Sequence, residues 1–215
     1  MIERYTRPEM GHLWSIQNEW QTILNVEIAA CEAMAELGEI PTAAVENIKK
    51  NARFDVARIN EIEKTTDHDI IAFLTNLEEN VGEDSKYIHK GLTSSDVKDT
   101  AYCVMMRDAA AIILDDLRAF REVLRRRAEE FRHTPCIGRT HGIHAEPMTF
   151  GLKLLLWSAE IERDIERLTR AKEIVSVGKL SGAVGTYSNI DPRIEELTCK
   201  KLGITPVRLA TQVIQ

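Results

Sequence analysis

The sequence predicts an all-α protein. Two stretches, at about residues 95–131 and 148–175, carry apolar residues every three or four positions over lengths that ordinary globular helices rarely reach. The first stretch contains no proline and no glycine, so nothing in it would interrupt a helix. Aromatic residues make up only 6% of the chain, while Ala, Leu, Ile and Glu are abundant, which favours helices over sheets.

Length, charge and the absence of long apolar runs limit the classes to which this protein can belong. With 215 residues, the chain can form one ordinary domain or two small ones. Its net charge of −6 is unlike that of a general nucleic-acid binder, which is usually basic. No apolar run approaches the roughly 18 residues of a membrane span, and the first residues lack the apolar segment of a secretory signal. We expect a cytoplasmic protein that binds neither nucleic acid nor membrane.

The cysteines agree with this location. They lie far apart and form no Cys-x-x-Cys motif, so a zinc ribbon or a thioredoxin-type site is unsupported. Scattered cysteines in a chain of this size are typical of reduced, mostly buried thiols in a cytosolic protein. The four residues are Cys31, Cys103, Cys136 and Cys199.

The first ninety residues predict four helices, most of which have a recognisable start or stop signal. Gly38 suits a helix stop, Pro41 a first helical position and Asp55 an N-cap. The helices are expected at about residues 10–37, 41–52, 55–62 and 70–82. Together they predict a small helical N-terminal domain over residues 1–92.

Residues 93–215 are expected to form the first part of a bundle of long helices. The two long helices are joined by a polar hinge at residues 134–147, which we expect to be a loop. A glycine-containing turn at residues 178–185 and a short helix at 191–202 follow. The two long helices would leave apolar faces that one short helix cannot cover, so we expect the chain to be the front part of a longer protein.

Three polar clusters lie near predicted helix ends, where binding groups often gather. They are residues 65–69, 89–96 and 138–147. The second cluster ends in Thr-Ser-Ser-Asp, which would cap the following long helix. The free N–H groups and hydroxyls at such a helix start would also suit a carboxylate or phosphate. Both interpretations stay open at this point.

Histidines are the candidate acid–base groups. His68 lies between Asp67 and Asp69, and a neighbouring carboxylate can orient an imidazole and favour its charged form. The alternative is a surface histidine beside an aspartate N-cap. His141 and His144 lie three residues apart, a spacing that could serve a metal ion. Since no third ligand is near, general acid–base work suits this segment better.

Taken together, the clusters resemble those of the adenylosuccinate lyase family in the fumarase/aspartase superfamily. Residues 93–96 match the family's Thr-Ser-Ser-Asp segment, and residues 138–147 match its Gly-Arg-Thr-His-Gly-x-His-Ala-Glu-Pro segment. The sequence after the Thr-His pair typically differs in other members of the superfamily. Three shorter matches lie at Arg4-Tyr5, His68-Asp69 and 181–187.

The resemblance implies a reaction. Members of this family cleave a C–N bond by β-elimination and release fumarate, from adenylosuccinate to give AMP and from the succinylated aminoimidazole carboxamide ribotide. No cofactor and no metal is implied. A homotetramer is implied, with each active site built from several subunits. The alternatives are another fumarate-releasing lyase, such as an argininosuccinate lyase, and a non-catalytic helical oligomerisation or nucleotide-binding module.

The same resemblance implies roles for individual residues. His141 would be the general acid that protonates the departing nitrogen, with His68 as its partner histidine. Thr93 and Ser94 would hold a succinyl carboxylate. The other expected contacts with the substrate are Arg4 and Tyr5, on the nucleotide phosphate, and Asp67, Asp69 and Gln212.

One family feature is missing from residues 1–215. The catalytic base of the family is a serine on a Gly-Ser-Ser loop that continues to a Met-Pro-x-Lys-x-Asn segment, and the sequence contains no such loop. We therefore expect this chain alone to have no lyase activity.

Overall fold

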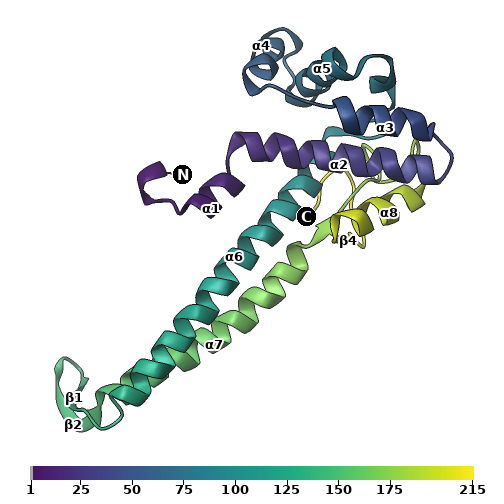
Figure 1. Cartoon of the computed structure of the whole chain (residues 1–215). Helices are drawn as coiled ribbons and strands as arrows, with labels where there is room; N and C mark the ends of the chain where they lie inside the picture. Colours follow the sequence, from purple (N-terminus) through teal and green to yellow (C-terminus); the bar gives the residue numbers. More distant parts are fainter. Residues whose placement is uncertain (1) are drawn as a thin grey trace. The chain divides into compact units, whose positions relative to one another are not determined.

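The computed structural model describes residues 2–215 (Figure 1). They divide into two compact units: unit 1 comprises the residues up to Arg107 together with Val175–Gln215, and unit 2 comprises Asp108–Ile174. The division predicted at residue 92 falls close to the start of the long helix α6 (Ser94–Glu130). The compact units instead divide inside α6, because its first turns pack into the core of unit 1.

Unit 1 is mostly helical, which confirms the predicted fold class. Its two short strands, β3 and β4, form a parallel pair in which Val177 lies opposite Thr205. None of the helices in the described part of the chain is both long and apolar enough to cross a membrane. Besides the start of α6, its elements are η1 (Glu3–Tyr5), α1 (Pro8–Leu13), α2 (Ile16–Glu36), α3 (Thr42–Asn51), α4 (Val56–Thr66), α5 (Asp69–Val81), η2 (Gly82–Tyr87), β3 (Val177–Gly178), α8 (Pro192–Leu202) and β4 (Thr205–Pro206).

The single helix predicted over residues 10–37 is wrong, because the structure has two helices there. Ser15 Oγ accepts a hydrogen bond from the N–H of Asn18 at 3.2 Å, so Ser15 is the N-cap of α2. Apolar residues keep their helical spacing across this break, which hides it from a periodicity argument. The predicted stop is confirmed, since Gly38 has a φ of +76°, the left-handed conformation in which helices often end.

The other helix starts predicted in unit 1 agree with the structure to within a residue. Asp55 Oδ1 accepts from the N–H of Arg58 at 3.0 Å and caps α4 as predicted. Asp191 caps α8 in the same way. Pro41 is the N-cap of α3 and not its first residue. Local capping chemistry therefore sets most helix starts in unit 1.

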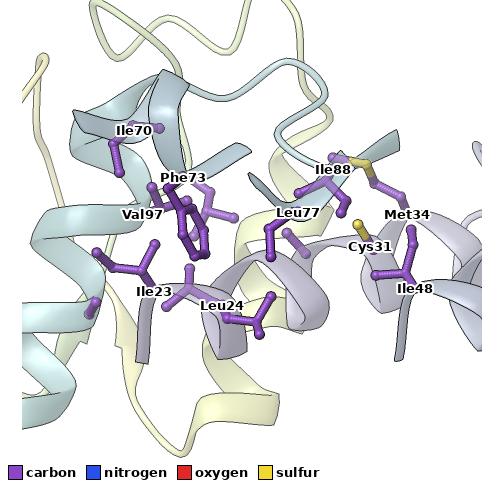
Figure 2. Packing of buried hydrophobic residues seen from close by; sticks show 14 of the residues in the cluster. Ile23, Leu24, Cys31, Met34, Ile48, Ile70, Phe73, Leu77, Ile88 and Val97 are labelled. Carbon is purple, nitrogen blue, oxygen red and sulfur yellow. The ribbon is translucent and has the colours of Figure 1, made fainter. Parts of the chain in front are cut away.

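The core of unit 1 forms around α2 and α5 (Figure 2). Phe73 is fully buried and stacks on Trp20 with 4.9 Å between ring centroids. Phe54 meets Phe73 edge-on, with 5.9 Å between ring centroids. The same cluster includes residues from α6 and from the C-terminal part of the chain, namely Val97, Ala101, Leu180, Ile190 and Ile194. The start of α6 is therefore fixed to the core of unit 1.

Unit 2 consists of the rest of α6, a β-hairpin and most of α7 (Phe150–Val175). Leu124 and Ala128 of α6 pack on Leu154 of α7. A Cβ atom on Gly151 would lie 2.4 Å from the carbonyl oxygen of Ala128. Glycine at this position allows the two helices to approach closely.

The loop predicted over residues 134–147 is wrong, because this segment forms an antiparallel hairpin. β1 (Pro135–Thr140) pairs with β2 (Ile143–Thr149), and Thr140 lies opposite Ile143. His141 and Gly142 form the turn with φ values of +53° and +74°, as in a two-residue type I′ hairpin turn. Most side chains of both strands are exposed, so the apolar alternation that indicates a strand is missing.

Replacing Phe73 with Ala should lower the free energy of unfolding by about 3–5 kcal/mol, because it leaves a cavity beside Trp20. Chemical denaturation followed by circular dichroism measures this change. Ile71, on the same helix, is 45% exposed, and the matched variant Ile71→Ala should change the unfolding free energy by less than about 0.5 kcal/mol. Equal effects of the two substitutions would contradict the central place of Phe73 in the core.

Candidate active site

His68 links the start of α5 to the start of α6. As the N-cap of α5, its Nδ1 accepts a hydrogen bond from the N–H of Ile71 at 3.4 Å. Its Nε2 lies 3.4 Å from Ser94 Oγ. In the neutral tautomer in which Nδ1 accepts this bond, Nε2 carries the hydrogen and donates it to Ser94. Nδ1 also lies 3.5 Å from Asp69 Oδ1. The cap is thus the histidine itself, and not an aspartate as in the alternative considered from the sequence.

The two aspartates beside His68 have different surroundings. Asp69 accepts from the N–H of Ile70 at 2.7 Å and forms an ion pair with Lys98 of α6. Partial burial acts to raise the pKa of Asp69, but the bonds from Lys98 and Ile70 outweigh it and hold the pKa below its usual value. Asp67 ends α4 with a φ of +50°, and its side chain is exposed. Asp69 is therefore anchored to α6, whereas Asp67 faces solvent.

Asp96, in the first turn of α6, is fully buried and accepts four hydrogen bonds. Oδ2 accepts from the N–H groups of Thr93 at 2.9 Å and Gly182 at 3.1 Å. Oδ1 accepts from the N–H of Ser181 at 3.1 Å and from Lys179 Nζ at 2.5 Å. The bond to Thr93 is one half of a capping box, which confirms the predicted capping role of this segment.

The glycine-containing turn after Lys179 is also tied to α8. Glu195 accepts from the N–H of Leu180 at 2.7 Å and from the hydroxyl of Tyr187 at 2.8 Å. Burial raises the pKa of Glu195 in spite of these two bonds. Burial and the hydrogen bond to Glu195 raise the pKa of Tyr187 to about 12. The hydroxyl of Tyr187 therefore stays protonated and keeps donating to Glu195.

Gln212 lies in a C-terminal segment that is anchored on both sides. Before it, Gly185 packs so closely that a Cβ atom there would lie 2.2 Å from the carbonyl oxygen of Ala210. After it, the N–H of Ile214 donates to Asp99 of α6 at 2.8 Å. The side chain of Gln212 is exposed. The fold thus brings Gln212 to the region of unit 1 that contains the turn and α6.

Arg4 and Tyr5 share the short helix η1. The guanidinium carbon of Arg4 lies 4.8 Å from the centroid of the Tyr5 ring, and both side chains are exposed. Within the described residues, neither side chain forms a hydrogen bond with His68 or Ser94. The structure therefore joins His68 to Ser94 directly and leaves Arg4 and Tyr5 as a separate pair.

His141 occupies the hairpin turn of unit 2 and is exposed. Its neighbour His144 lies opposite Arg139 across the hairpin. No group of three His, Cys, Asp or Glu side chains among the described residues could hold a metal ion. His141 belongs to unit 2, whereas His68, Thr93 and Ser94 belong to unit 1.

A pair formed by buried Glu27 and largely buried His89 was not predicted from the sequence. Glu27 is 1% exposed, and its Oε1 lies 2.5 Å from His89 Nδ1 while Oε2 accepts from the backbone N–H of His89 at 2.9 Å. Burial acts to lower the pKa of His89, but the hydrogen bond and the charge of Glu27 outweigh it and raise that pKa. The signal in the sequence was a glutamate on the apolar face of a predicted helix.

Comparison with known proteins gives a consistent result. The model of a protein family described as Lyase matches residues 3–214. Adenylosuccinate lyase of Bacillus subtilis is 51% identical over 215 residues, which are 100% of this chain and 50% of the relative. Adenylosuccinate lyase of Synechocystis sp. is 54% identical over 214 residues, again 100% of this chain and 50% of the relative. The chain spans about half the length of the curated relatives it matches.

Solved structures resemble the fold. A fumarate lyase from Mesorhizobium sp. has a TM-score of 0.89 at 29% identity, over 94% of this chain and 49% of that chain. The 3-carboxy-cis,cis-muconate lactonizing enzyme from Pseudomonas putida has a TM-score of 0.88 at 28% identity, over 95% of this chain and 48% of that chain. The fold described above is therefore one that these structures share.

The Glu27–His89 pair should make stability depend on pH in one direction. The pKa of His89 is raised in the folded state, while an unfolded histidine has a pKa of about 6.5. Folding therefore favours the protonated ring. The stabilisation is fully present below about pH 6.5 and is lost as the pH rises through the raised pKa of the folded state.

Free energies of unfolding measured at about pH 6 and about pH 9 check this direction. The unsubstituted chain should lose stability between these values, and His89→Gln and Glu27→Gln should each remove the same part of that loss. An unchanged pH dependence in His89→Gln would show that His89 is not its source.

Proposed function

The chain belongs to the Lyase family, and from this premise we propose that it carries the first part of an adenylosuccinate lyase active site. The reaction is a β-elimination that cleaves the C–N bond of adenylosuccinate to give AMP and fumarate. The same chemistry would act on the succinylated aminoimidazole carboxamide ribotide, in purine nucleotide biosynthesis. The observation that carries the proposal is the contact between His68 and Ser94 at the start of α6.

This contact prepares Ser94 to bind a carboxylate. The start of α6 offers N–H groups without partners inside the helix, and these favour an anion. We propose the His68 tautomer in which Nε2–H donates to Ser94 Oγ, which lies 3.4 Å away, so that the Ser94 hydroxyl hydrogen points elsewhere. We propose that it donates to a succinyl carboxylate, together with Thr93. Such donors stabilise the dianionic carboxylate that develops when the Cβ proton leaves.

We propose His141 as the general acid for the departing nitrogen. The type I′ turn exposes its ring at the end of the hairpin. No described residue forms a hydrogen bond with that ring, so both nitrogens remain available to a substrate. His141 and His68 would act in one site assembled from several subunits.

The proposed contacts along the rest of the substrate follow from charge and exposure. The guanidinium of Arg4 and the hydroxyl of Tyr5 would bind the nucleotide phosphate, the former by charge-assisted hydrogen bonds. Exposed Asp67 and Gln212 would offer polar contacts to the remainder. Asp69 would act together with Lys98, since the two form an ion pair beside His68. The elimination uses side-chain groups alone and requires no cofactor.

We propose a homotetramer as the working form. Both helices of unit 2 expose apolar side chains, and a groove of about 940 Å³ lies beside β1 and the start of α7. Exposed apolar surface of this extent is typical of protein–protein contacts. The exposed large apolar residues of the two helices within unit 2 are Ile113, Phe120, Val123, Phe150, Leu152, Leu155, Leu156, Trp157 and Ile174.

The state of the cysteines supports a cytoplasmic location. All four, in the described structure, are free thiols. Burial raises the pKa of Cys31, and burial raises that of Cys199 to about 12. The buried thiols of Cys31 and Cys199 are therefore protonated at neutral pH, as is typical of structural cysteines in reducing compartments.

A second candidate is another fumarate-releasing lyase of the same fold, which the likeness to a fumarate lyase structure favours. An argininosuccinate lyase would be one example. The segment from Gly142 to His144 argues for adenylosuccinate, because it matches the adenylosuccinate lyase motif.

An active fusion tests the proposed function. This chain would be joined to the half of the Bacillus subtilis adenylosuccinate lyase that it does not match, and fumarate release from adenylosuccinate would be followed. We expect turnover, and His141→Ala should lower kcat by about 10²- to 10⁴-fold, the usual worth of a general acid. His133→Ala, an exposed histidine outside the site, is the control and should leave kcat unchanged.

Two outcomes would overturn the proposal. Fumarate release from argininosuccinate but not from adenylosuccinate would show that the proposed substrate is wrong. Full turnover by a folded His141→Ala enzyme would remove its proposed role.

The 215-residue chain alone should show no turnover in the same assay, because its sequence lacks the Gly-Ser-Ser loop with the catalytic base. Circular dichroism would establish that the assayed chain is folded. Turnover equal to that of the fusion would mean that residues 1–215 contain a base of their own.

A further inference from the structure

We propose that Lys179 is a positioning residue for the site at the start of α6. Its buried ammonium group holds Asp96, and through Asp96 it sets Thr93 and the turn at Ser181 and Gly182 in place. This inference rests on the proposed function, and it assigns a role to a residue that none of the matched motifs includes.

The burial of this ion pair is not explained by stability alone. The side chains of Lys179 and Asp96 are both 0% exposed, and Nζ lies 2.5 Å from Oδ1. Removing two charges from water is costly, and well-packed apolar residues of similar volume often stabilise a protein equally well or better. A pair that gains little stability but fixes local geometry is consistent with a positioning role.

The carboxylate of Asp96 accepts as many hydrogen bonds as it has lone-pair positions. A carboxylate offers about four lone-pair positions, and Asp96 accepts from Lys179, Thr93, Ser181 and Gly182. Three of these donors belong to the segment after α7, while Thr93 precedes α6. One side chain thus joins two segments that are more than eighty residues apart in the sequence. An amide in its place could not accept all four bonds.

The backbone of Lys179 is held on α6 as well. Its N–H donates to Thr100 Oγ1 at 3.0 Å, and the same hydroxyl donates to its carbonyl oxygen at 3.1 Å. Thr100 lies one helical turn beyond Asp96 on α6. Nζ also donates to the carbonyl oxygen of Gly182 at 3.0 Å. Lys179 is therefore attached to two successive turns of α6 and to the glycine-containing turn.

The charge of Lys179 matters for an anionic ligand. Without the ammonium group, Asp96 would leave an uncompensated negative charge three residues after Thr93. That charge would repel the succinyl carboxylate that we propose Thr93 and Ser94 bind, and repulsion is strong where water is excluded. The nucleotide phosphate, assigned to Arg4 and Tyr5, would not be affected in this way.

The variant Lys179→Met in the active fusion distinguishes binding of the succinyl carboxylate from binding of the nucleotide phosphate. We expect inhibition by fumarate to weaken and kcat to fall by about 100-fold, the cost of a small misplacement of binding groups. Inhibition by AMP, which lacks the succinyl group, should stay unchanged. The control Lys49→Met breaks an exposed ion pair with Glu32, of 2.7 Å, and should change neither. Equal loss of fumarate and AMP inhibition would overturn the proposal.

A double variant separates positioning from stability. Lys179→Met alone leaves the buried carboxylate of Asp96 without a cation and should lower Tm. Asp96→Asn combined with Lys179→Met removes that charge and should recover much of the Tm. Fumarate inhibition should remain weak in the double variant, because an Asn side chain cannot replace the four accepting positions. If the double variant regains kcat and fumarate inhibition along with Tm, the pair only stabilises the fold and the inference is wrong.

Amide hydrogen exchange on the 215-residue chain tests the inference without turnover. Exchange at the N–H groups of Ser181 and Gly182 should become much faster in Lys179→Met and stay unchanged in Lys49→Met, since only the first releases the turn from Asp96. If the unsubstituted fusion shows no turnover, the proposed function is wrong. The exchange measurement would still show whether Lys179 holds the turn at Ser181 and Gly182 in place. Unchanged protection at both amides would overturn the role of Lys179.

Discussion

The buried carboxylate of Asp96 is the constraint on which the rest of the candidate site depends. It has no access to water, so its charge must be met inside the protein. Lys179 and three backbone N–H groups meet it. To bring them together, the chain must return after α7 to the start of α6. One buried charge therefore couples the first turn of α6 to the turn that follows β3.

Two further interactions act at the same helix end. His68 Nε2 lies within hydrogen-bonding distance of Ser94 Oγ, and Asp69 forms an ion pair with Lys98 in the next turn of α6. They hold the start of α5 against the start of α6. The hydroxyl and N–H groups in this region are thereby oriented before any ligand arrives. Such preorganised donors are what stabilises charge that develops during a reaction.

Unit 2 contributes a different kind of element. Its hairpin presents His141 through a turn that requires positive φ at two successive residues. The helices that support the hairpin share a small buried cluster and expose much apolar surface. The proposed general acid, His141, belongs to this unit, whereas the proposed anion-binding residues Thr93 and Ser94 belong to unit 1.

The sequence by itself determined the features that depend on neighbouring residues. Helical periodicity and local signals such as Asp55 and Gly38 placed most helices to within a few residues. The motif match singled out His68, Thr93, Ser94 and His141 as residues for chemistry. It could do so because caps and motifs are short stretches of chain whose chemistry is complete without distant partners.

Tertiary structure alone decided the pairings between distant residues. Glu27, Asp96 and Lys179 are buried and His89 is largely buried, and each buried charge would be unfavourable without its partner. A local sequence pattern cannot show which residue, sixty or eighty positions away, will neutralise a buried charge. The hairpin was not predicted because its strands are mostly exposed and lack apolar alternation. The break at Ser15 was not predicted because apolar residues keep their helical spacing across it. The role of His68 as a cap that also lies within hydrogen-bonding distance of Ser94 likewise required α5 and α6 to be folded together.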